Sequence, residues 1–140
     1  MTAITRATPA RRLTVSLLVG AGALVALAAN SIVAIAAVAA GANAAFPPLM
    51  TALYGPFSVV GVVIAYLGWS IIRSRAAHPA RVLRVLVPVL SVLSFVPDSV
   101  LLATGFIPGA SPTAVVALMI MHVVVIGVAV PLSLRLAPLR

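Results

Sequence analysis

The sequence predicts an all-α fold, a four-transmembrane-helix up-down bundle, from three observations. Hydrophobic residues make up 64% of the 140 residues and charged residues only 7%, whereas a soluble domain carries roughly 25% charged residues. No charged residue occurs from Leu13 to Ile72. This run holds two spans and a turn, because one span needs about 20 apolar residues. All other charges flank apolar segments, with one exception that is described below.

We expect a single integral membrane domain over residues 1–140. Its spans are predicted at residues 13–40, 56–72, 81–102 and 112–134. The paired Arg11 and Arg12 before the first span resemble the start of a signal peptide. However, the apolar run that follows is about twice as long as the roughly 7 to 15 residues of a signal sequence. We therefore interpret it as a retained first helix.

Proline and glycine mark the connections between the predicted spans. Gly41 and Pro47 end the first span, and residues 46–54 are expected to form an uncharged connection. Pro56 suits the first position of the second span. The stretch "TGFIPGASP" is an uncharged turn between the third and fourth spans, which should therefore be antiparallel neighbours.

Arginine placement predicts the orientation of the bundle. All nine arginines lie in the N-terminal segment, in the connection between the second and third spans, or in the C-terminal segment. The other two connections carry none. Positive residues favour the cytoplasmic side. We therefore predict a multi-pass protein of the bacterial plasma membrane with both termini cytoplasmic (N-in/C-in). The arginines are Arg6, Arg11, Arg12, Arg73, Arg75, Arg81, Arg84, Arg135 and Arg140.

The net charge of +8 also bears on partners. In a soluble protein it would suggest nucleic acid, but beside membrane spans it suits lipid headgroups. The expected partners are the lipid bilayer and, in addition, a second copy of the chain or another membrane protein. No nucleic-acid partner is expected.

The only acidic residue, Asp98, falls inside the third predicted span. It lies about six residues from the end of that span, which is about 9 Å deep at 1.5 Å per residue. His122 and Asn30 are expected at a similar level on other spans. Ser91 and Ser94 share a helix face with Asp98. These five residues form a candidate polar or proton-linked site that should face the bundle interior, because a charged side chain in lipid is costly.

Two interpretations of this polar group remain open. In the first it is a structural clasp, in which Asp98 accepts hydrogen bonds from His122 and Asn30 while Ser94 helps to cap the carboxylate. In the second, Asp98 and His122 form a functional site that carries a proton near neutral pH.

Other chemistry is not supported by the residues present. The chain has no cysteine, which excludes disulfides, thiol redox chemistry and thiolate metal sites. Met119 and His122 make only a weak copper pattern, and one histidine within a span is a poor basis for haem. No nucleophile stands beside the Asp-His pair. No catalytic residue, metal or cofactor is predicted, and an enzyme is not expected.

The stretch "FVPDSVLLATGFIPGASPTAVVALMIMHVVV" resembles a family of small four-helix integral membrane proteins from actinobacteria, an uncharacterised domain of unknown function. The resemblance rests on Asp98, on the turn at Pro108 and Gly109, and on Met121 with His122. The stretch "GPFSVVGVVIAYLGW" is also similar. The resemblance implies a four-span bundle and no known activity.

Two functional classes follow from these observations. The first is a structural, interaction or assembly role in the plasma membrane, with small-residue faces such as Gly22 with Ala26, and Gly61 with Ala65, packing against a partner. The alternative is a small transporter or ligand-binding membrane protein that uses the intramembrane Asp98/His122 pair.

Overall fold

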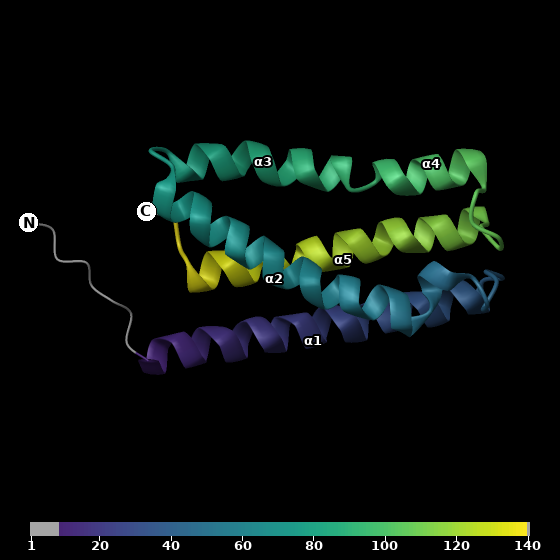
Figure 1. Ribbon diagram of the computed structural model, residues 1–140, viewed down its shortest axis with the longest axis horizontal. Helices are drawn as coiled ribbons and strands as arrows, with labels where there is room; N and C mark the ends of the chain where they lie inside the picture. The colour runs from purple at the N-terminus through teal and green to yellow at the C-terminus, as the bar shows by residue number, and fades with distance from the viewer. Residues whose placement is uncertain (1–8, 140) are drawn as a thin grey trace, which may run out of the picture.

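The computed structural model describes residues 9–139, which form helices joined by short connections and contain no strand (Figure 1). Four helical segments are long and apolar enough to cross a membrane, as predicted. The third of them consists of two consecutive helices. The elements are α1 (Pro9–Ala39), η1 (Pro47–Leu49), α2 (Thr51–Arg75), α3 (Pro79–Leu93), α4 (Val96–Thr104) and α5 (Pro112–Leu136).

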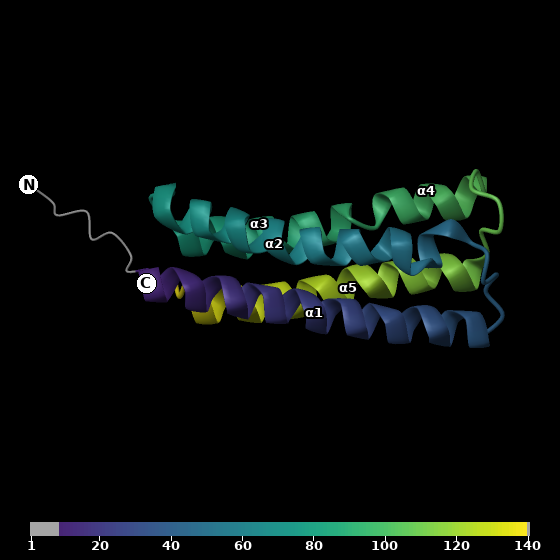
Figure 2. The ribbon, with the colours of Figure 1, turned by 60° about the horizontal axis from the view of Figure 1, so that its bottom comes forward.

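Helices α1, α2 and α5 pack closely on one another, as two views show (Figures 1 and 2). Small residues permit this approach. A Cβ atom on Gly22 would lie 2.7 Å from Leu132 Cδ2, and one on Gly61 would lie 3.0 Å from Val125 Cγ1. Ala26 is fully buried in the same cluster. These small residues therefore pack inside the chain's own bundle and are not the free faces for a partner that the sequence suggested.

A second core cluster closes the bundle at the end where α1 is joined to α2. Phe46, in the connection, is fully buried there. The connection also contains the single turn η1, and α2 already begins at Thr51. Pro56 thus lies inside α2 and not at its first position. Because proline has no N–H, the helix lacks one backbone hydrogen bond there, the one to the Ala52 carbonyl.

The third span is interrupted and is not the single helix expected over 81–102. Helix α3 ends at Leu93 and α4 begins at Val96. The cause is Pro97, which has no N–H to donate to the Leu93 carbonyl and whose ring crowds that carbonyl. The two halves of the span have different neighbours: α3 packs mainly on α2, and α4 packs mainly on α5. The α3–α4 unit lies to one side of the other three helices (Figures 1 and 2).

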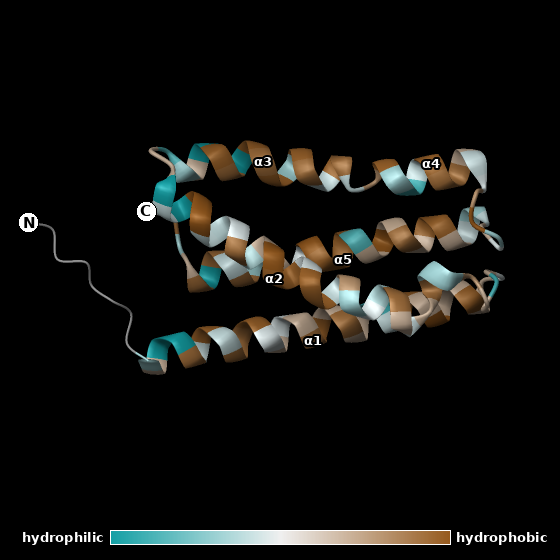
Figure 3. Cartoon of the chain, in the orientation of Figure 1, coloured by the Kyte–Doolittle hydropathy of each residue, from teal (hydrophilic) through white to brown (hydrophobic). Residues whose placement is uncertain are grey.

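The helices are hydrophobic along most of their length, and hydrophilic residues gather where α1 begins, α2 ends and α3 begins (Figure 3). Arg11, Arg12 and Arg73 all lie at this end, where the two helices α1 and α2 border a common pocket. Arg6 and Arg140, which also entered the orientation argument, lie outside the described residues.

Orientation remains a prediction that labelling can test. Ala44 and Ala77 are both exposed and lie in connections at opposite ends of the bundle. Because the chain has no cysteine, single Ala44→Cys and Ala77→Cys variants give unambiguous sites. We expect an impermeant maleimide to label the first in intact cells and the second only after lysis. The reverse pattern would contradict the N-in/C-in arrangement.

Candidate functional site

An open-sided cavity of about 820 Å³ lies between the third span and helices α2 and α5. Helices α2, α3, α4 and α5 supply its walls, and most lining side chains are aliphatic or aromatic. It extends from Trp69 and Leu83 near the arginine-bearing end to Phe106 and Ile107 near the opposite end. Of the described residues of α1, Asn30 alone lines it.

Asp98 and His122 meet at this cavity, as the sequence predicted. Asp98 Oδ2 lies 3.2 Å from His122 Nδ1. The same nitrogen lies 2.9 Å from the carbonyl oxygen of Leu118, one turn earlier in α5. Asp98 Oδ2 is buried and makes no aligned hydrogen bond, so its contact with His122 is mainly electrostatic. The Phe95 ring packs edge-on to the imidazole, with 6.3 Å between the ring centroids.

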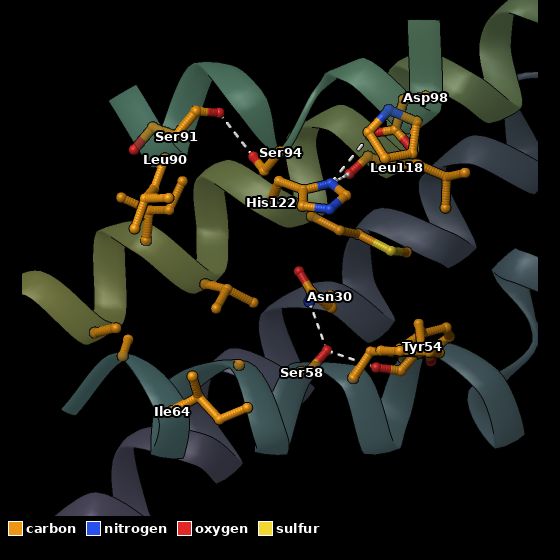
Figure 4. Close-up of a pocket in the computed structure, with 18 of the residues that line it drawn as sticks. Asn30, Tyr54, Ser58, Ile64, Leu90, Ser91, Ser94, Asp98, Leu118 and His122 are labelled. Carbon is orange, nitrogen blue, oxygen red and sulfur yellow. Dashed lines mark hydrogen bonds and ion pairs between the residues drawn. The ribbon is translucent and has the colours of Figure 1, made fainter. Parts of the chain in front are cut away.

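Asn30 does not contact Asp98 in the way that the clasp interpretation required. Its Nδ2 donates to Ser58 Oγ at 2.7 Å, and Ser58 Oγ donates to the Tyr54 carbonyl at 2.8 Å. Asn30 is only 1% exposed, and its amide oxygen is buried with no hydrogen-bond partner. In Figure 4 the Asn30 side chain points from the α1–α2 side towards the His122 ring.

Ser91 and Ser94 line the same cavity as Asp98, but neither hydroxyl binds Asp98. Ser91 Oγ donates to the Val87 carbonyl at 2.7 Å, and Ser94 Oγ donates to the Ser91 carbonyl at 2.7 Å. A hydroxyl in apolar surroundings readily bonds to a carbonyl of its own helix. Ser94 is therefore not the cap of Asp98 that the sequence suggested, because both hydroxyl groups donate to backbone carbonyls of their own span.

Sequence reasoning missed the residues that hold Asn30. Tyr54 and Ser58 are one turn apart on α2, and Tyr54 Oη donates to Ser31 Oγ at 3.0 Å. Ser31 Oγ donates in turn to the Leu27 carbonyl. The spacing of Asn30 and Ser31 on α1 against Tyr54 and Ser58 on α2 was the available signal. This network fixes the α1–α2 contact at the level of the Asp98–His122 pair.

The site combines an apolar volume with a small set of polar atoms. Two buried oxygens, Asp98 Oδ2 and Asn30 Oδ1, are hydrogen-bond acceptors without aligned donors. Among the cavity-lining residues that the structure describes, Asp98 is the only carboxylate, and none is arginine or lysine. The described residues hold no group of three His, Cys, Asp or Glu side chains suited to a metal ion. The arrangement is suited to accept hydrogen bonds from a donor group and to balance one positive charge.

The fold and this site define a small four-span membrane protein with a polar group inside its spans. The chain matches a family of unknown function, DUF6069, over residues 8–138, and it belongs to that family. No curated protein and no solved structure matches the chain.

Proposed function

We propose that this protein binds a small amphiphilic molecule inside the membrane. The apolar body of the ligand occupies the cavity beside the third span, and a hydrogen-bond donor on the ligand contacts Asp98 and Asn30. One observation carries this proposal: an apolar cavity of about 820 Å³ contains two buried acceptor oxygens without aligned donors.

The dimensions and chemistry of the cavity support ligand binding. Small-molecule sites are typically clefts of about 300 to 1,000 Å³ with apolar walls and a few placed polar groups. Buried polar atoms normally have hydrogen-bond partners, and an exception calls for an explanation. A bound donor supplies the missing partner for Asn30 Oδ1. Transport and sensing would both begin with this binding step.

An interaction or assembly role is the other functional class, and it stays a prediction. Its basis in the sequence was the pair of small-residue faces, and Gly22, Ala26 and Gly61 are used in packing within the chain. Ala65 lies on the cavity. The cavity therefore favours ligand binding as the function to test first.

Filling the cavity tests the proposal. Gly68 lines the cavity and has open space where a Cβ atom would be added. We expect Gly68→Leu to place an isobutyl group in the ligand volume. A fatty alcohol that carries a diazirine, reconstituted with the protein in nanodiscs, should photolabel α2, α3 and α5 in the unmodified protein. Labelling of cavity-lining residues should fall severalfold in Gly68→Leu.

Gly127→Leu is the matched control. Gly127 also has open space around an added Cβ atom, but it does not line the cavity. Both variants make the same change inside a helix, so general effects on helix stability are equal. Equal labelling of the two variants, or labelling confined to residues away from the cavity, would show that the cavity does not bind the probe.

A further inference from the structure

Charge at the cavity identifies the ligand class more narrowly, on the assumption that the proposed function is correct. We propose that the ligand is an amphiphilic ammonium ion with at least one N–H group, and that its binding releases one proton from the Asp98–His122 pair. The ammonium donates to Asp98 and Asn30, and its hydrocarbon part lies along α2 and α3.

The two acceptor oxygens favour a ligand that carries hydrogen-bond donors, and the carboxylate favours a ligand that is positively charged. Asp98 is only 6% exposed and Asn30 1%, and both reach the cavity. An ammonium group supplies several N–H donors and a positive charge, which match the needs of an amide oxygen and a carboxylate. A fatty acid would instead bring a second carboxylate beside Asp98, and like charges in a poorly solvated site repel strongly.

The proton count follows from the single carboxylate. The Asp98 carboxylate balances one positive charge, which is either a proton held by the Asp98–His122 pair or the charge of the ligand. With both present, an apolar cavity would hold one positive charge without a counter-ion, and burying an unpaired charge is very costly. The ammonium therefore displaces the proton, which passes to water, and the net charge of the site stays the same.

Other titratable groups on the surrounding helices do not alter this count. Helix α2 contributes Tyr54, whose hydroxyl is hydrogen-bonded to Ser31 and to Thr51. Helix α5 contributes His122, α4 contributes Asp98, and the lining residues of α1 and α3 are not titratable. The pair is thus the place at which a proton and a cation compete.

Four probes with the same dodecyl chain test the ligand class. Dodecylamine, dodecyltrimethylammonium, dodecanol and dodecanoate are titrated, each as a competitor of the diazirine alcohol, into the protein in phosphatidylcholine nanodiscs. Dodecylamine should compete best. The quaternary ion lacks N–H donors and should bind about 10- to 100-fold more weakly, in line with the worth of hydrogen bonds to charged groups. Dodecanoate should not compete.

Proton release is measured with dodecyltrimethylammonium, which has no proton of its own to lose. In lightly buffered solution with a pH-sensitive dye, its binding should release up to one proton per protein. Asp98→Asn should bind the cation much more weakly and release none, with far-UV circular dichroism and gel filtration reporting on folding. Ser99→Ala, which changes an exposed neighbour on α4, should behave like the unmodified protein.

The outcomes separate the two proposals. If dodecanol competes as well as dodecylamine, the cation assignment is wrong while ligand binding stands. If dodecyltrimethylammonium competes without releasing a proton, the proposed exchange of a proton for the ligand cation is wrong. If neither the diazirine alcohol labels the cavity nor any dodecyl probe stabilises the protein, the proposed function itself fails.

Discussion

Replacement of His122 by Leu is expected to destabilise the protein by about 1 to 3 kcal/mol, the cost of a buried acceptor that loses its partner, whereas replacement of Asp98 by Leu should cost little. Only the Asp98 side of the pair is buried, because the His122 side chain is 40% exposed. His122 Nδ1 lies 3.2 Å from Asp98 Oδ2, and that oxygen has no aligned hydrogen bond. His122→Leu therefore leaves the carboxylate alone in an apolar cavity.

Replacement of Asp98 by Leu leaves no unpaired charge. When Asp98 is removed, His122 Nδ1 keeps the Leu118 carbonyl at 2.9 Å, and a neutral imidazole needs no counter-ion. The double variant Asp98→Leu/His122→Leu should be as stable as the unmodified protein or more stable, because apolar replacements of a buried ion pair are often neutral or stabilising.

The free energy of unfolding in mixed micelles of an ionic and a non-ionic detergent measures all three variants. The loss in His122→Leu should also shrink as the pH is lowered, because a protonated carboxyl is neutral. Equal losses in the two single variants would contradict this account. They would support the symmetric clasp, in which each side chain depends on the other.

The spans and the Asp98–His122 contact could be predicted because both depend on composition. A long apolar run has few alternatives to a membrane helix. A chain with one acid and one histidine in its spans lowers its energy by bringing them together. The short connection between Thr104 and Pro112 places the two helices side by side, which makes the contact possible.

The hydrogen-bond partners could not be predicted in the same way. Asn30 had several polar side chains at its level, and the choice of Ser58 depends on how α1 and α2 rotate as they pack. The break at Ser94 required knowledge of how Pro97 is accommodated, since a membrane helix tolerates proline either as a kink or as an interruption. The cavity depends on how far the third span lies from α2 and α5, which no local pattern encodes.

Phe46 is the side chain whose loss should most weaken the end of the bundle where α1 is joined to α2. It belongs to the connection between α1 and α2, yet it is fully buried. It packs in one cluster with Ala34 and Ala37 of α1, Leu101 of α4 and Val115 of α5. The connection therefore shares a core cluster with three helices, including α4, which otherwise packs mainly on α5.

Phe46→Ala is therefore expected to reduce the free energy of unfolding by about 3 to 5 kcal/mol, the usual cost of a large cavity at a buried aromatic position. Phe57→Ala is the matched control, because Phe57 is 71% exposed and loses few protein contacts on truncation. The same mixed-micelle titration should show a change of less than about 1 kcal/mol for that variant. Similar losses at the two positions would mean that Phe46 does not hold the connection against the bundle.

Because Phe46 packs with Leu101, one turn after Asp98 on α4, its truncation should also loosen the helix that carries the carboxylate. Phe46→Ala should therefore weaken binding of dodecylamine, even though Phe46 does not line the cavity.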